Sequence, residues 1–257
     1  MATGRILIIV HQKTSTSGNV GALLQARGYQ LDQRCPCIGD ALPDHLEDHD
    51  GVVVFGGPMS ANDDTHLDGI GQELKFIDRV LARDLPFIGI CLGGQLLARA
   101  LGAKVAPDAG GRVEIGYTEV SPTAAFAGLF DASRYFFQWH KEGFDLPAGT
   151  RLMAAGQVYP HQAFLHGARA VGLQFHPEIN ADMIQRWTRG GGHRTDQPNA
   201  QPVAAHAIGY RLFNDGIARW TENLFEFVGL PSRATTALAA GEGGAHAGGW
   251  GPLGALS

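Results

Sequence analysis

Cysteine is scarce in this sequence, with 3 residues in 257, and the number is odd. A framework of disulfides is therefore not expected, and a reducing compartment is the default for such a chain. Long apolar runs are missing as well. The N-terminal run Ile6 to Val10 is shorter than the hydrophobic region of a signal peptide, which needs about 7–15 residues. No stretch approaches the roughly 18 apolar residues of a membrane span, so we expect a cytoplasmic protein.

An excess of positive charge is also missing, because the formal net charge is −5. The chain therefore offers no electrostatic footprint for nucleic acid or an anionic membrane, and a small-molecule substrate suits it better. Patterns typical of metal sites are missing too. The 11 histidines are scattered, and Cys35 and Cys37 have only one residue between them, which makes a poor zinc site. We expect no metal and no cofactor.

What the sequence does have is an alternation of apolar runs and helical patterns, with 44% hydrophobic residues to fill a core. Buried or half-buried strands are predicted at 6–10, 29–34, 52–55 and 86–90, and helices at 19–27, 68–83 and 92–101. This order predicts an α/β fold with a doubly wound, mostly parallel sheet. Ligands bind such sheets beyond the carboxyl ends of the strands.

The second half of the chain carries a different pattern, with short strands predicted at 112–120, 134–140, 151–155, 163–166 and 170–175. Few helices lie between them, which favours a small antiparallel extension. A short helix is predicted at 182–188, a polar, glycine-rich loop at 189–202, and one or two helices at about 203–228.

We expect residues 1–232 to form a single domain. The Gly/Ala-rich segment 233–257 has almost no charge and is predicted to be a disordered tail.

The segment Gly89-Ile90-Cys91-Leu92-Gly93 joins a predicted strand to a predicted helix. The pattern G-x-C-x-G is the thiol version of a nucleophile elbow, a sharp turn that exposes the nucleophile. The start of the helix favours negative charge on the thiol, and the N–H of Leu92 can face a developing oxyanion. Cysteine is also among the most buried residues. The glycine spacing thus leaves a nucleophile and a structural cysteine about equally favoured.

A second motif, His176-Pro177-Glu178, ends an apolar strand pattern. Residues two apart on an extended chain share a face. His176 could therefore take the thiol proton, and Glu178 could orient the imidazole. Alone, the motif also fits an ordinary polar strand end. Its combination with the cysteine elbow favours a triad of Cys91, His176 and Glu178.

A third motif, Gly56-Gly57-Pro58, follows the predicted strand 52–55. A turn of this kind can present a backbone N–H to an oxyanion, most simply that of Gly57. It also fits an ordinary turn.

Together these motifs resemble the class I (triad) glutamine amidotransferases, which include the glutaminase half of GMP synthetase and stand-alone, GMP synthase-like relatives. The matching segments come in family order and cover roughly residues 4–190: GGPMS (56–60), GICLGGQ (89–95), EIG (114–116), WHKEGF (139–144), QAF (162–164) and GLQFHPE (172–178). The resemblance implies the flavodoxin-like fold of that family.

The resemblance also implies a mechanism. Cys91 would attack the side-chain amide of glutamine and form a γ-glutamyl thioester, while His176 moves protons and Glu178 holds His176. The N–H groups of Gly57 and Leu92 would form the oxyanion hole. Substrate contacts would come from Gly56, Gln95, Trp139 and His140, although Trp139 and Lys141 depart from the Ser-His-Gly type of loop in GMP synthetase.

Two alternatives remain open at this point. A γ-glutamyl peptide or conjugate hydrolase would use the same triad. A redox-sensing protein would oxidise the thiolate without acyl transfer, although His176, Glu178 and Gln95 argue against it. The residues after the recognisable core are too few for a synthetase domain. We therefore expect any ammonia acceptor to be a separate synthetase or partner protein, with glutamine or a γ-glutamyl small molecule as substrate.

Overall fold

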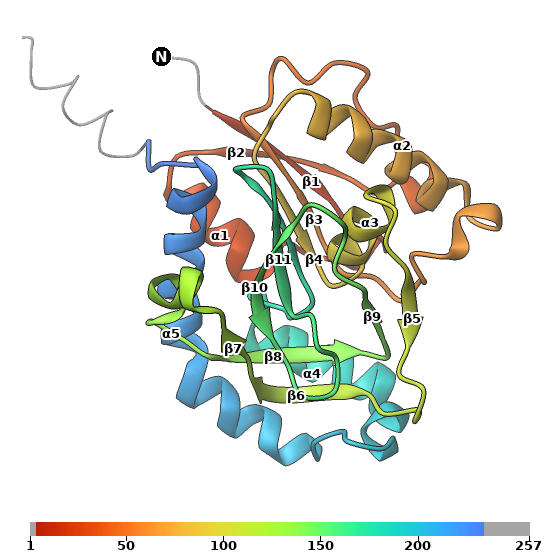
Figure 1. Ribbon diagram of the computed structural model, residues 1–257, viewed down its shortest axis with the longest axis vertical. Coiled ribbons are helices and arrows are strands. Elements are labelled where there is room, and N and C mark those ends of the chain that lie inside the picture. The colour runs from red at the N-terminus through yellow and green to blue at the C-terminus, as the bar shows by residue number, and fades with distance from the viewer. Residues whose placement is uncertain (1–3, 234–257) are drawn as a thin grey trace, which may run out of the picture.

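The computed structural model describes residues 4–233 and is built around an eight-stranded sheet (Figure 1). In spatial order the strands are β2 (Gln30–Arg34), β1 (Arg5–Ile9), β3 (Gly51–Val54), β4 (Phe87–Ile90), β12 (Ala170–Leu173), β11 (Ala163–His166), β10 (Arg151–Ala155) and β7 (Ser121–Pro122). The first five strands are parallel, and the last three continue the sheet in antiparallel fashion. The predicted mostly parallel sheet is confirmed.

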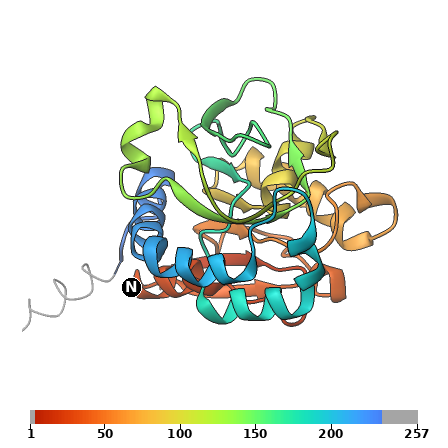
Figure 2. The same cartoon turned by 90° about the horizontal axis from the view of Figure 1, so that it is seen from below.

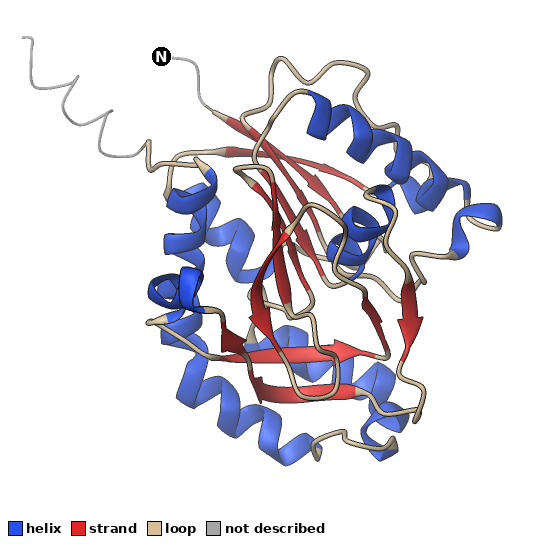
Figure 3. Ribbon diagram, in the orientation of Figure 1, coloured by secondary structure: helices blue, strands red, loops and turns tan. Residues whose placement is uncertain are grey.

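Helices cover both faces of this sheet (Figure 3). Helices α1 (Gly18–Ala26) and α5 (Val203–Val228) lie on one face, and α2 (Asp68–Ala82) and α3 (Leu92–Ala100) lie on the other. Successive residues of a strand point to opposite faces, so Ile6 and Ile8 pack in the first core, whereas Leu7 and Ile9 pack in the second. This explains why the central strands are apolar along almost their whole length, apart from the exposed Arg5 at the start of β1, as the doubly wound prediction requires.

Two smaller strand pairs extend the domain. Strand β6 (Glu114–Glu119) pairs with β8 (Tyr135–His140), and β5 (Val105–Pro107) pairs with β9 (Glu142–Phe144), both antiparallel. The β6–β8 pair crosses beneath the main sheet in Figure 1. Strands β5, β7 and β9 were not predicted, because they are only two or three residues long. Short 3₁₀ turns occupy Pro36–Ile38, Asp63–Thr65, Ala124–Phe130 and Gly192–Asp196.

The prediction of a loop over 189–202 is wrong in its first half. Helix α4 runs from Ala181 to Gly191 and is followed directly by the 3₁₀ turn. The side chain of Asn180 caps α4 by accepting a hydrogen bond from the N–H of Met183 at 2.9 Å. Glycines near the end weaken the helical pattern in the sequence, but they do not stop a helix that is packed against a neighbour. Figure 2 shows α4 beside α5.

The C-terminal region forms one helix, α5, rather than two. Its glycines serve close packing. A Cβ at Gly209 would lie 2.2 Å from the Tyr117 ring, and one at Gly216 would lie 2.5 Å from the carbonyl of Ala132. Trp220 and Phe225 of α5 are fully buried in the core shared with α1. Apart from Arg233, the predicted tail lies outside the described residues. Over 4–233 no helix combines the length and apolarity needed to cross a membrane.

Candidate active site

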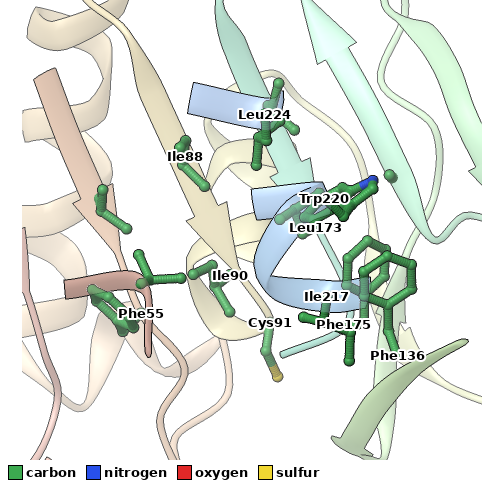
Figure 4. Packing of buried hydrophobic residues seen from close by; sticks show 14 of the residues in the cluster. Phe55, Ile88, Ile90, Cys91, Phe136, Leu173, Phe175, Ile217, Trp220 and Leu224 are labelled. Carbon is green, nitrogen blue, oxygen red and sulfur yellow. The ribbon is translucent and has the colours of Figure 1, made fainter. Parts of the chain in front are cut away.

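Cys91 lies at the turn between β4 and α3 in a conformation that few side chains adopt. Its φ is +51° and its ψ is −105°, which places a non-glycine residue in strained backbone of the kind that clusters at functional sites. The strain is held by two hydrogen bonds: the Cys91 N–H donates to Leu173 O at 2.8 Å, and the Cys91 carbonyl accepts from the Gln95 N–H at 2.9 Å. Figure 4 shows the sulfur pointing beyond the end of the strand.

Three glycines around Cys91 allow α3 to approach the sheet. A Cβ at Gly89 would lie 2.4 Å from Gly93 O, one at Gly93 would lie 2.1 Å from Val54 O, and one at Gly94 would lie 2.4 Å from Leu173 O. No side chain fits at such distances from backbone atoms. The glycines around Cys91 are therefore required sterically. They allow α3 to begin directly after the cysteine.

His176 and Glu178 follow the neighbouring strand β12. The predicted strand over 170–175 ends early, at Leu173, because the chain turns away from β4 and the His176 N–H donates to Phe137 O of β8 at 2.8 Å. The imidazole Nδ1 lies 2.7 Å from Glu178 Oε1, and both side chains are almost completely buried. The other ring nitrogen, Nε2, makes no hydrogen bond of ordinary geometry within residues 4–233.

The electrostatics of His176 favour its protonated form. Burial by itself lowers the pKa of the imidazole, but the negative charges of Glu178 and of the Cys91 thiolate outweigh it and raise that pKa from 6.5 to about 10. The direction of this shift favours a protonated imidazole at neutral pH. The imidazole and the thiol are coupled although they come from different strands.

The Gly56-Gly57 turn after β3 closes the site from another side. A Cβ at Gly56 would lie 2.8 Å from His176 Cε1 and 3.5 Å from Cys91 Cβ. A glycine is thus needed where this turn meets both side chains. Leu92 is the first residue of α3, and N–H groups at this position of a helix have no acceptor within the helix.

These residues line one cavity of about 420 Å³. Its walls come from six regions: the loop after β1, the Gly56-Gly57 turn, the elbow, Trp139 of β8, the His176–Glu178 segment after β12, and α4 with the following turn. The lining residues that matter below are Gly56, Gly57, Cys91, Trp139, His176, Glu178, Arg186, Trp187 and Arg194. Residues from both halves of the sequence therefore meet at the carboxyl ends of the parallel strands.

The sequence model for class I glutamine amidotransferases matches residues 19–184 of this chain, well over half of its length. The chain belongs to the class I glutamine amidotransferases. Members of this family are generally glutamine-hydrolysing enzymes.

Similar proteins agree with this assignment. The glutamine amidotransferase-like protein YfeJ of Salmonella typhimurium is 28% identical over 190 residues, which is 70% of this chain and 78% of that protein. One subunit of the glutamine-hydrolysing GMP synthase of Archaeoglobus fulgidus is 30% identical over 138 residues, which is 53% of this chain and 70% of that relative.

The fold is shared with solved glutamine amidotransferases. The structure from Thermotoga maritima has a TM-score of 0.79 at 28% identity and covers 89% of this chain and 100% of its own. The structure from Methylobacillus flagellatus has the same TM-score at 26% identity and covers 88% of this chain and 94% of its own. The predicted glutamine amidotransferase fold is confirmed.

Two of the expected substrate contacts lie behind the cavity wall of this amidotransferase. Gln95 is buried on α3, where its amide donates to Glu142 O at 2.9 Å and lies 3.4 Å from Gln174 Oε1. His140 is also buried. Its Nδ1 bonds Glu142 O at 2.9 Å, and its Nε2 lies 3.0 Å from Glu114 Oε2. Both side chains thus support the backbone at Glu142, whereas Trp139 and Gly56 line the cavity directly.

Several side chains at the site were not singled out from the sequence. Gln174 places its amide 3.8 Å from Cys91 Sγ. Trp187 packs edge-on against His176, with ring centroids 4.9 Å apart. Arg186 and Arg194 bring positive charge to the cavity. Arg186 and Trp187 lie within the predicted helix 182–188, but its periodicity does not show which face of the helix meets the cavity, and Arg194 lies in the segment predicted as a loop. An arginine and a tryptophan adjacent in sequence, close after HPE, were an available signal.

Proposed function

We propose that this protein hydrolyses the side-chain amide of glutamine to glutamate and ammonia through a thioester on Cys91. One observation carries the proposal. Cys91 and His176 line the same cavity, Glu178 holds one imidazole nitrogen at 2.7 Å, and the other nitrogen has no hydrogen-bond partner of ordinary geometry within residues 4–233. This arrangement suits a nucleophile, a proton carrier and an orienting carboxylate.

The first half of the reaction begins with the thiolate of Cys91 beside a protonated His176, whose raised pKa suits the role of proton donor. The sulfur of Cys91 forms a bond to the side-chain carbonyl carbon of glutamine. His176 then gives its proton to the amide nitrogen, the C–N bond breaks, and ammonia leaves. The product is a γ-glutamyl thioester with a neutral His176.

The second half restores the site. Neutral His176 takes a proton from water as the water oxygen attacks the thioester carbon. The C–S bond breaks, and Cys91 leaves as a thiolate beside a protonated His176. The new carboxylic acid loses its proton, which ammonia takes up to give ammonium.

The tetrahedral oxyanion formed in both halves needs donors. We assign this role to the N–H groups of Gly57 and Leu92. Leu92 begins a helix, so its N–H is free of an intrahelical acceptor and lies at the positive end of the dipole. Gly57 lines the same cavity as Cys91, and a Cβ there would lie 3.0 Å from the Leu92 side chain. Donors of this kind are worth about 10²–10³ in kcat each.

The substrate contacts follow from the cavity wall. Gly56 and Trp139 line the cavity and would touch the substrate. Gln95 and His140 would act on it indirectly, by holding the backbone of Glu142 next to the site. Ammonia would pass to a separate acceptor or synthetase, which is supported by the name of the Archaeoglobus relative as one subunit of a GMP synthase.

A second candidate function is hydrolysis of γ-glutamyl conjugates, and one observation favours it. The cavity of about 420 Å³ lies in the range of pockets that hold ligands larger than one amino acid. Arg186, Arg194 and the two indoles of Trp139 and Trp187 line it. These side chains suit a leaving group that carries a carboxylate or an aromatic ring.

Glutamate release by the purified protein tests both candidates. Free glutamine and a panel of γ-glutamyl amides and γ-glutamyl amino acids serve as substrates, with Cys91→Ala as the catalytic control. Turnover of glutamine that Cys91→Ala abolishes supports the glutaminase. A kcat/KM at least about tenfold higher for γ-glutamyl amino acids, lost in Arg186→Gln but kept in Arg189→Gln, supports the conjugate hydrolase. Turnover that persists in Cys91→Ala contradicts both.

A further inference from the structure

A second buried pair of histidine and glutamate lies behind the Gly56-Gly57 turn. His11 follows β1 and Glu73 lies on α2, so the two are far apart in the sequence. Nε2 of His11 is 3.1 Å from Oε2 of Glu73, and both side chains are completely buried. Neither residue lines the catalytic cavity. A pair of this kind is costly to bury, so its contacts show what it holds in place.

The remaining nitrogen of His11 bonds the turn itself. Nδ1 lies 3.2 Å from the carbonyl oxygen of Gly56. A carbonyl only accepts hydrogen bonds, so Nδ1 must carry a proton. This holds for both ways of distributing protons in the pair: imidazolium with carboxylate, or neutral imidazole with a carboxylic acid that donates to Nε2. In each case the net charge is zero and Nδ1–H donates to Gly56 O.

The hydrogen bond from His11 Nδ1 to Gly56 O fixes the direction of the Gly57 N–H group. In a trans peptide the C=O of one residue and the N–H of the next point in opposite directions. The carbonyl of Gly56 points to His11, which is outside the cavity, so the N–H of Gly57 points away from His11. Gly57 also packs directly on the imidazole, since a Cβ there would lie 2.8 Å from His11 Cγ.

The turn needs such a restraint because both of its residues are glycines. A Gly-Gly peptide can rotate at low cost, since neither residue has a Cβ to restrict its backbone. Rotation of this peptide would direct the carbonyl of Gly56, which is an acceptor, to the place of the Gly57 N–H, which is a donor. His11 opposes this rotation because its Nδ1–H holds the carbonyl of Gly56, which must move when the peptide rotates.

We infer that His11, held by Glu73, is a positioning residue that keeps the N–H of Gly57 directed at the oxyanion. The inference rests on the proposed function, because it assumes that an oxyanion forms on Cys91. Glu73 acts one step further away. By bonding Nε2 it fixes the orientation of the ring that brings Nδ1–H to Gly56 O.

Three variants test this role. His11→Leu combined with Glu73→Met removes the donor without leaving a buried charge. His11→Asn retains an N–H donor near the position of Nδ1. Glu73→Gln retains a polar partner for Nε2. For the double variant we expect kcat for the best wild-type substrate to fall about 10- to 100-fold with little change in KM. We expect His11→Asn to recover most of that loss.

Alkylation of Cys91 by iodoacetamide separates positioning from general damage. This reaction forms no oxyanion, so its rate should stay within about threefold of wild type in all three variants. A kcat that falls together with the alkylation rate, or one that His11→Asn fails to recover, contradicts the inference.

A crystal structure of the double variant provides a test that needs no activity. We expect the Gly56-Gly57 peptide to be rotated or to occupy two orientations. An unchanged peptide would overturn the inference whatever the kinetics. A wild-type protein that is inactive on every substrate would instead contradict the proposed function, so the two failures are distinguishable.

Discussion

The two sides of the Gly56-Gly57 turn carry the same pair of residue types arranged for different purposes. On the cavity side, His176 is held by Glu178 at one nitrogen and keeps the other free of partners among the described residues. On the buried side, His11 is held by Glu73 at one nitrogen and by Gly56 at the other. A buried His–Glu pair therefore does not mark a catalytic site. The His176–Glu178 pair differs from the His11–Glu73 pair because one imidazole nitrogen of His176 makes no hydrogen bond of ordinary geometry with any residue that the structure describes and His176 lines the cavity.

A third pair supports the same lesson. His140 lies 3.0 Å from Glu114, and both of its nitrogens are occupied, by Glu142 O and by groups on Gln138 and Glu114. Like His11, this residue fixes backbone near the site. The sequence places His140 beside a motif that resembles the substrate loop of the family, yet its side chain is turned away from the cavity.

The largest effect is expected on the cavity side, from His176→Asn. This change removes the proton carrier, and we expect kcat for the best substrate to fall by about 10⁴ or more. His45→Asn is a matched control, because the His45 side chain is 88% exposed and makes no contact with the cavity residues. Steady-state glutamate release checks both. A His176→Asn enzyme within tenfold of wild type would mean that the pair is merely structural on both sides of the turn.

Glu178→Gln should have a smaller effect. The amide keeps the shape but loses the charge that raises the pKa of His176, so that pKa should move down from about 10. We expect kcat to fall about 10²- to 10⁴-fold. Titration of the His176 imidazole by NMR measures the shift directly. An unchanged pKa would show that the charge of Glu178 does not raise the pKa of His176.

Gly56→Ala should disturb the packing of the Gly56-Gly57 turn against His176. The new methyl group would lie 2.8 Å from His176 Cε1, so the imidazole or the turn must move. A shift of about 1 Å can cost about 10²-fold in rate, and we expect a loss of about 10- to 100-fold in kcat. Gly128→Ala is the control, since a Cβ there meets nothing within 4 Å. Equal activity in both variants would contradict the packing argument.

The two sides of the turn also differ in how far the sequence predicted them. That Cys91, His176 and Glu178 lie at one cavity could be predicted because their signals are local: glycines flank the cysteine, and the histidine and glutamate are two residues apart. The partnership of His11 and Glu73 could not, because it depends on which helix covers which strand. A weak signal existed, since Glu73 falls on the apolar stripe of α2 formed by Ile70, Phe76 and Ile77.

The fold shows the same division. The parallel half, through α3, was predicted almost element by element, because β1, β3 and β4 are almost entirely apolar and its helices have regular periodicity, whereas β2 is polar and partly exposed. The second half contains strands of two or three residues and buried polar residues such as Gln138 and Gln162, which bond each other at 2.7 Å. Their side chains resemble surface residues in the sequence, so patterning could not place them.

The smallest effect is expected in the pH dependence of stability. The pKa of His176 is raised from 6.5 to about 10 in the folded protein, so folding favours its protonated form. This contribution is fully present below pH 6.5 and is lost as the pH rises through about 10. Other groups titrate in the same range, so the useful quantity is the difference between wild type and His176→Asn in the free energy of unfolding, measured by urea denaturation from pH 6 to 10.5. We expect that difference to change in favour of the variant as the pH rises. A difference independent of pH would show that the imidazole on the cavity side carries no extra proton in the folded state, and the thiolate starting point of the proposed mechanism would then be wrong.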